Sequence, residues 1–246
     1  MELWHLPLLV AGGFACGVIN AMAGGGSFVT LPLLLLIGLP PQIANATNRV
    51  AIVLQTAAGV ATYHHHGVRP WRHLPPIAVP TVLGSFLGAW LAAHIDEADF
   101  RKAAAVLFVV MIGTVFLDPK RWQRRATLGN IRPWLYPVFF LMGIYGGFLQ
   151  AGLGVLLIGT FVVLGGYDVV NGNALKFSLA FAFTAAALIT FAGYGQVQWL
   201  TGLALAVGTV IGGIVGARLV ISQGVKWVRW FVVVAAVGAI VKLLSG

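Results

Sequence analysis

The chain has 246 residues, of which 59% are hydrophobic and 9% are charged, and its mean hydropathy is +0.94. Soluble domains carry roughly 25% charged residues, so this composition excludes a soluble protein and predicts a polytopic membrane protein whose main surroundings are the lipid bilayer. The formal net charge of +9 comes from basic residues that sit mainly in short loops. This is the usual orientation signal of membrane proteins, and we expect no nucleic acid partner.

Apolar runs alternate with polar breaks along the chain, five before a basic linker and five after it. In order, the runs cover residues 6–22, 27–38, 42–63, 75–93, 102–117, 134–150, 153–166, 172–193, 199–220 and 228–244. A helix needs about 17 to 25 residues to cross a bilayer, so 27–38 and 153–166 are expected to be broken or re-entrant helices. The predicted fold class is an all-α polytopic membrane protein with about eight to ten helical segments.

The two halves of the chain are related in sequence. Adding 128 to a residue number aligns them without a gap and pairs residue types that rarely match by chance: Asn45 with Asn173, Trp71 with Trp199, and Arg101 with Arg229. This offset indicates an internal duplication. It divides one membrane domain into a first repeat, 1–118, a basic cytoplasmic linker, 119–128, and a second repeat, 129–246.

The loops predict opposite orientations for the two repeats. The linker and the loop 64–73 are basic, so we expect both in the cytoplasm. The acidic stretch 94–99 and the uncharged loop 192–199 are then expected outside. Because 64–73 and 192–199 are equivalent under the offset, the repeats would be inverted, a recurring plan of secondary transporters. Small-residue ladders such as Gly84-x-x-x-Gly88 indicate close helix packing.

The first break in each half is rich in glycine. A helix that begins at Ser27 would present free N–H groups and its positive dipole end to an anion, and Asn20 shares a helical face with Gly24. Glycine runs also serve as kinks or packing contacts, and that alternative stays open. The candidate anion-binding residues of these breaks are Asn20, Gly24, Gly25, Gly26, Ser27, Gln150, Gly152 and Gly154.

The second break in each half precedes a cation inside an apolar run. Cations are costly there and usually functional, although Arg49 could instead snorkel to the interface and the neighbouring Asn and Thr residues could cap helices. The partner of Lys176 is expected to be either Asp168, the nearest acid, or an anionic solute. The candidates here are Asn45, Thr47, Asn48, Arg49, Asn173 and Lys176.

The sequence indicates no metal site, no cofactor and no catalytic residue. Three successive residues of a helix point in different directions, so His64, His65 and His66 cannot bind one metal ion; a solvated cytoplasmic cap and a pH-sensing role both remain open. The single Cys16 excludes an intrachain disulfide and a cysteine-built metal site. No carboxylate pair lies in an apolar run, which favours anions over cations as substrates.

The first-copy pattern of Gly24–Ser27, Pro32, Gly38 and Ala44–Asn48 resembles the signature of the TauE/SafE family. A degenerate second copy at 152–176 extends the resemblance over essentially the whole chain. The resemblance implies a membrane permease for sulfur-containing or organic anions, such as sulfite, sulfonates or sulfoacetate, with the ligand held where the two broken motifs meet.

We therefore expect a multi-pass protein of the bacterial inner membrane that is a secondary transporter and not an enzyme. It would move a small sulfur-containing or organic anion by alternating access, with proton or ion coupling open. An anion channel on the same scaffold and an intramembrane enzyme built on the histidines are the alternatives.

Overall fold

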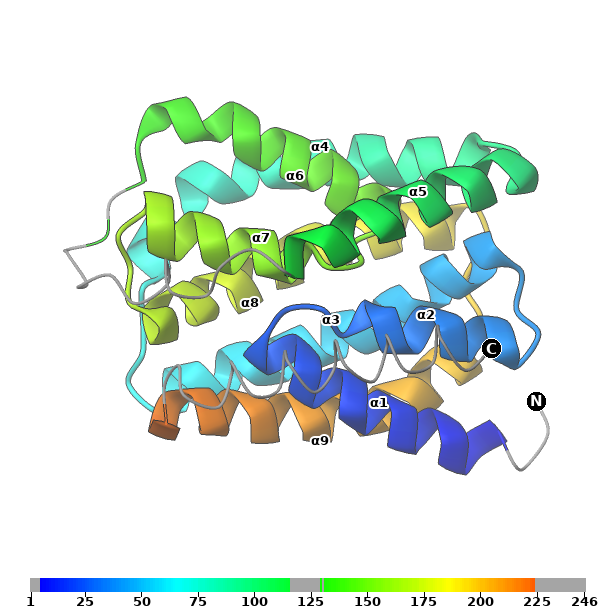
Figure 1. Cartoon of the computed structure of the whole chain (residues 1–246), viewed down its shortest axis with the longest axis horizontal. Coiled ribbons are helices and arrows are strands. Elements are labelled where there is room, and N and C mark those ends of the chain that lie inside the picture. The colour runs from blue at the N-terminus through cyan, green and yellow to red at the C-terminus, as the bar shows by residue number, and fades with distance from the viewer. Residues whose placement is uncertain (1–4, 116–128, 130, 224–246) are drawn as a thin grey trace.

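The computed structural model describes residues 5–115, 129 and 131–223, and within these ranges every regular element is helical (Figure 1). The elements are α1 (His5–Met22), α2 (Ser27–Leu36), α3 (Pro41–His65), η1 (Trp71–His73), α4 (Pro75–His94), α5 (Glu97–Val115), η3 (Pro133–Leu135), α6 (Tyr136–Phe148), α7 (Leu153–Gly159), the π-helical η4 (Thr160–Leu164), α8 (Val169–Gly193) and α9 (Trp199–Gln223). The predicted all-α class is confirmed. The predicted linker 119–128 and the predicted last run 228–244 lie outside the described residues.

Four of the described helices are long and apolar enough to cross a membrane, namely α1, α4, α8 and α9. Helix α3 has the same 25-residue length as α8, but its hydropathy is lowered by the buried polar side chains that follow Ala44. Helix α2 and the continuous α7–η4 element are apolar but too short to span a bilayer. They occupy the two short runs that the sequence predicts as broken helices.

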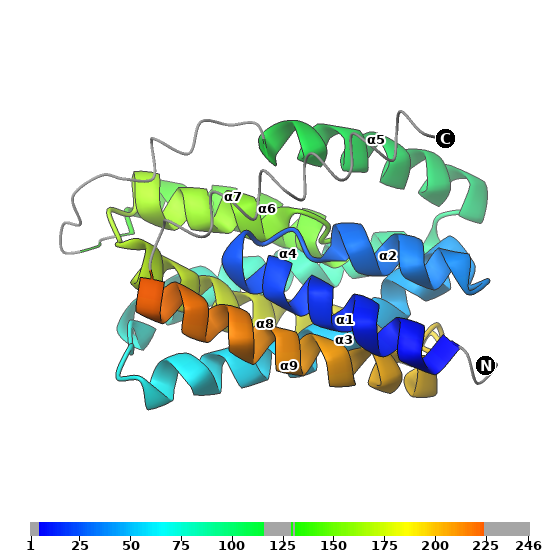
Figure 2. The same ribbon diagram turned by 60° about the horizontal axis from the view of Figure 1, so that its bottom comes forward.

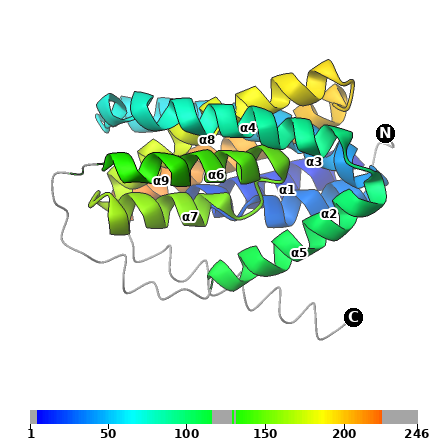
Figure 3. The ribbon, with the colours of Figure 1, turned by 90° about the horizontal axis from the view of Figure 1, so that it is seen from above.

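The helices lie roughly along the long axis of the molecule, with α3 and α8 packed against each other in its interior. Helix α1 packs along α9 (Figure 2), and α4 packs along α6 (Figure 3). Helix α3 also contacts α9, and α8 also contacts α4. Helix α5 lies at the edge of the molecule in Figures 2 and 3. The central pair α3–α8 is therefore flanked by two helix pairs, each with one member from either half of the chain.

The described elements of the two halves correspond at the sequence offset. Helix α3 begins at Pro41 and ends at His65, and α8 begins and ends at the equivalent positions of the second half, Val169 and Gly193. The described glycines with positive φ form three pairs at that same offset: Gly24 with Gly152, Gly38 with Gly166, and Gly67 with Gly195. Helix α3 runs from right to left in Figure 1, whereas α8 runs from left to right. The paired helices are therefore antiparallel in the molecule.

The two segments that the sequence predicts outside the cell, 94–99 and 192–199, lie together at one end of the molecule. The side chain of Gln42 donates hydrogen bonds to the carbonyls of Ala92 (3.2 Å) and Ile95 (2.6 Å), and Gln196 donates to Ala93 (3.1 Å). The loop after α8 therefore lies beside the end of α4. The loop 64–73 lies at the opposite end of the bundle (Figure 1).

Two helices begin several residues earlier in the chain than the apolar runs predict. Helix α8 begins at Val169, because the side chain of Asp168 caps it by accepting from the N–H of Asn171 at 2.9 Å. Helix α3 begins at Pro41, within one residue of the predicted start, and no side chain caps it. The expectation that Asn and Thr of the second breaks cap these helices is therefore wrong. Helix α5 begins at Glu97 and not near residue 102, because its acidic first turn favours the positive end of the helix dipole.

Glycine allows the flanking helices to cross at backbone contact. A Cβ added at Gly88 of α4 would collide with the carbonyl oxygen of Ile144 in α6, and one at Gly212 of α9 would collide with that of Phe14 in α1. These contacts explain the small-residue ladders as packing surfaces.

We expect Gly88→Ala to destabilise the protein by about 1–3 kcal/mol, because the added methyl group overpacks the α4–α6 crossing. Gly159→Ala is the matched control, since a Cβ there meets no atom within 4 Å. Thermal unfolding in detergent compares the two variants. Equal melting temperatures would contradict the backbone contact at Gly88.

Candidate functional site

The two glycine-rich breaks meet in the interior of the protein. Helix α1 ends before Gly24, where φ is +82°, and α6 ends before Gly152, where φ is +77°. A Cβ added at Gly24 would collide with the backbone of Gly154, and one at Gly154 would collide with the backbone of Gly24. Only glycine allows this approach, so the breaks of the two halves touch each other directly.

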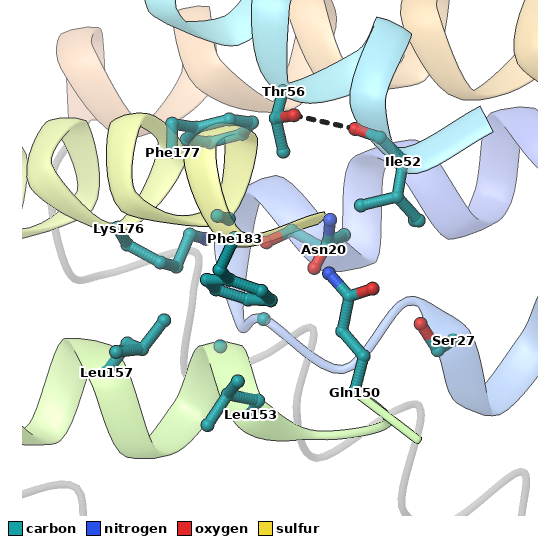
Figure 4. Close-up of a pocket in the computed structure, with 13 residues that line it drawn as sticks. Asn20, Ser27, Ile52, Thr56, Gln150, Leu153, Leu157, Lys176, Phe177 and Phe183 are labelled. Carbon is teal, nitrogen blue, oxygen red and sulfur yellow. Dashed lines mark hydrogen bonds between the residues drawn. The ribbon is translucent and has the colours of Figure 1, made fainter. Parts of the chain in front are cut away.

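A small pocket with a volume of about 20 Å³ lies beside this contact. Figure 4 shows the side chains of Asn20, Gln150 and Lys176 converging on it from α1, from the break after α6 and from α8. Its lining is Asn20, Gly24, Ser27, Ile52, Thr56, Gln150, Leu153, Gly154, Leu157, Lys176, Phe177, Ala180 and Phe183. The pocket thus combines hydrogen-bonding groups with an apolar and aromatic wall.

Lys176 is the cation that lines the pocket, and its side chain is buried. Its Nζ donates to the carbonyl oxygens of Asn20 (2.7 Å) and Ala21 (3.3 Å), at the C-terminal end of α1. The last carbonyls of a helix lack intrahelical partners and carry the negative end of its dipole. Because Asp168 caps α8 instead, the predicted alternative of an Asp168–Lys176 pair is wrong.

Arg49 is fully buried, and three of its four hydrogen bonds go to groups from the other half of the chain. Its Nη1 donates to the carbonyl of Gly146 (2.6 Å) and to Oε1 of Gln150 (2.5 Å). Its Nη2 donates to the carbonyl of Gly147 (3.0 Å) and to Oδ1 of Asn45 (3.3 Å). Arg49 therefore does not snorkel, and it reaches the pocket only through Gln150.

The two halves hold each other's broken helices reciprocally. Asn45 donates to the carbonyl of Phe148 at 2.8 Å, at the end of α6, and Asn173 donates to that of Ala21 at 2.7 Å, at the end of α1. Asn45 and Asn173 are equivalent under the sequence offset. A side chain of α3 thus donates a hydrogen bond to a carbonyl at the end of α6, and a side chain of α8 does the same for a carbonyl at the end of α1. Backbone groups freed by the breaks are covered by protein, as a membrane interior requires.

Six of the fourteen predicted site residues line the pocket, namely Asn20, Gly24, Ser27, Gln150, Gly154 and Lys176. The other eight do not, and these are Gly25, Gly26, Asn45, Thr47, Asn48, Arg49, Gly152 and Asn173. Two of these eight form hydrogen bonds to other segments of the protein. Asn48 donates to Oγ of Ser27 at 3.4 Å, and Thr47 accepts from the N–H of Gln198 at 3.0 Å.

Other polar groups near the pocket are absent from the sequence-based prediction. Thr56 lines it, and Thr184 accepts from Nε2 of Gln150 at 2.7 Å. These two threonines are equivalent under the sequence offset, so the duplication could have indicated both. Phe177 and Phe183 resemble ordinary core residues in the sequence and give no signal. Gln55 is buried and accepts from Nδ2 of the pocket residue Asn20 at 3.2 Å.

The histidines after Tyr63 lie exposed at the C-terminal end of α3, away from the pocket. Within the described ranges, no group of three or more His, Cys, Asp or Glu side chains could hold a metal ion.

Several membrane-spanning helices, two interrupted helices that meet in the interior and a buried cation beside a pocket define a multi-pass membrane protein with an internal polar site. The chain belongs to the sulfite exporter TauE/SafE family, whose family model matches residues 9–243. The protein is thus a multi-pass bacterial membrane protein of a transporter family.

Similar proteins cover nearly the whole chain. A probable membrane transporter protein of Haemophilus influenzae is 31% identical, over 93% of this chain and 90% of that one. The probable membrane transporter protein ORF9 of Sinorhizobium sp. is 27% identical over 98% and 92% of the two chains. The probable membrane transporter protein YfcA of Escherichia coli K12 is 29% identical over 93% and 85%. No solved structure matches the chain.

Proposed function

We propose that the protein is a secondary transporter of the bacterial inner membrane that carries a small sulfonate or a related sulfur-containing or organic anion. The pocket where the two breaks meet would be the binding site. The observation that carries this proposal is Lys176, a buried cation in the pocket wall whose only hydrogen bonds within the described residues go to backbone carbonyls. An ammonium has three donors, so one remains for a bound anion.

Further donors surround the same space. The Oγ of Ser27 accepts a hydrogen bond from Asn48, which leaves its own hydrogen free to donate. Ser27 is also the first residue of α2, and the first N–H groups of a helix favour anions. A sulfonate presents three oxygens to such donors, while Phe177 and Leu153 of the wall suit its carbon end.

Alternating access is supported by the reciprocal contacts of the two halves. Equivalent helices run antiparallel, and the sharp glycine turns recur at one offset. We infer that the halves are inverted repeats, with the pocket at their interface, as in other secondary transporters. Rocking of one half against the other would then open the pocket to each side in turn.

Counterflow in proteoliposomes tests this function. Methanesulfonate serves as the probe because it stays a monoanion at neutral pH. We expect saturable uptake of radiolabelled methanesulfonate that unlabelled methanesulfonate inside the vesicles accelerates, and no such uptake in protein-free vesicles. Non-saturable flux with single-channel current would favour the anion channel instead, and absence of any protein-dependent flux would contradict the proposal.

A further inference from the structure

We propose that Lys176 couples transport to protons, by carrying one proton with each monovalent anion and releasing it when the anion leaves. This inference rests on the proposed function and adds a driving force to it. The protein would then be an anion–proton symporter, and each full cycle would move no net charge.

None of the described residues that line the pocket is an acid that could balance Lys176. Of the acids within the described residues, Glu97 and Asp99 form exposed ion pairs with Arg101 (2.8 Å) and Lys102 (3.1 Å) at the start of α5. Asp96 is exposed in the loop before that helix, and Asp168 caps α8. A protonated Lys176 therefore leaves the empty pocket with an uncompensated buried charge, which is costly in an apolar medium.

The two buried cations differ in how the protein holds them. Arg49 makes four hydrogen bonds, two of them to the carbonyls at the end of α6, and a guanidinium does not lose its proton in proteins. Lys176 has two carbonyl acceptors and lies 4.7 Å from the ring centroid of Phe177. A neutral amine can still donate to both carbonyls, so the same geometry accommodates Lys176 with and without its extra proton.

Among the described residues around Lys176, no other group is suited to carry the proton. Helix α1 carries two titratable side chains: His5 at its first residue, at the opposite end of the helix from Asn20 and Ala21, and Cys16, which is buried and donates to Thr30. On α3, Tyr63 accepts from Asn173 (2.8 Å), and Arg49 lies behind Gln150. On α6, the hydroxyl of Tyr145 donates to the carbonyl of Ala151.

The remaining elements add little to this set. The α7–η4 element, 153–164, contains no titratable residue, and α9 carries only Arg218. The proton therefore passes between Lys176 and water, on whichever side the pocket is open.

The transport cycle follows from this charge balance. An ammonium and a monovalent anion form a neutral loaded site, which can reorient across the membrane interior. After the anion leaves, Lys176 loses its proton to water, and the empty site is again neutral when it returns. A site that kept the charge would return slowly, because an unpaired charge must cross an apolar region.

Proton movement in the wild-type protein tests the inference directly. Proteoliposomes contain the pH dye pyranine, and methanesulfonate is added outside. We expect the interior to acidify as methanesulfonate enters, and an outside-acid pH gradient to drive accumulation. Saturable counterflow without proton movement or any response to the pH gradient would overturn the coupling and leave the proposed function standing. Absence of saturable counterflow would overturn the proposed function itself.

Lys176→Arg separates coupling from anion binding. We expect counterflow to remain measurable, because exchange needs only the loaded site to reorient. Proton-driven net uptake should fall on the order of tenfold or more, because the empty site stays charged. Lys102→Arg, on the exposed surface of α5, is the control and should behave as wild type. Proton-driven net uptake retained by Lys176→Arg would contradict the inference, and the pyranine measurement decides the question if this variant does not reconstitute.

Discussion

Arg49→Met is expected to destabilise the folded protein by about 3–5 kcal/mol, because it removes charged hydrogen bonds and leaves buried acceptors unpaired. Two of those acceptors, the carbonyls of Gly146 and Gly147, lie at the end of α6, and the other two are the side chains of Gln150 and Asn45. Methionine approximates the length of the side chain but supplies no donor. Thermal unfolding in detergent measures the effect, with a large drop in apparent melting temperature expected.

Arg101→Met is the matched control for this prediction. Arg101 pairs with Glu97 on the exposed face of α5, and exposed ion pairs contribute about 0–1 kcal/mol. A variant Arg49→Met that unfolds like wild type but binds methanesulfonate poorly would contradict the structural role given to Arg49. It would make Arg49 a direct ligand of the anion, as the sequence alone suggests.

Lys176→Gln is expected to weaken methanesulfonate binding about 10- to 100-fold, which corresponds to the roughly 1.5–3 kcal/mol of a hydrogen bond to a charged group. Glutamine can still donate to the carbonyl of Asn20, so α1 keeps a partner at its end. A bound ligand stabilises the native state, and thermal-shift titration with methanesulfonate therefore measures the affinity of each variant.

Lys102→Gln is the control, because it removes a cation of the same kind from an exposed ion pair. Its methanesulfonate affinity should equal that of the wild type. Equal affinities for Lys176→Gln and Lys102→Gln would show that the buried lysine is not the counter-charge of the anion.

The sequence predicts the helical framework well where apolar runs are long. The run 6–22 matches α1, and the run 75–93 matches α4 within a residue at its end. The predicted start of α3 agrees with Pro41 within one residue. The predicted start of α8 is wrong, because this helix begins directly after its capping residue Asp168. A polar capping residue is a local signal that lies outside the run of apolar residues.

The site is predictable only in part, because its contacts join distant segments. The glycine breaks and Lys176 are recognisable from residue type and spacing alone. The partners of Arg49 are backbone carbonyls of α6, and nothing in the residue types of Gly146 and Gly147 indicates that role. Arg49 binds the end of α6, whereas Lys176 lines the pocket. This difference between the two cations depends on the packing of the helices and cannot be predicted from the sequence.

The position of a bound anion tests the assignment of the binding site most directly. Methaneselenonate has the shape and charge of methanesulfonate, and its selenium gives an anomalous X-ray signal. We predict a selenium peak in the pocket between Ser27 and Lys176, with the oxygens within hydrogen-bonding distance of Nζ. A protein that transports the anion but shows the peak elsewhere, with this pocket empty, would contradict the assignment.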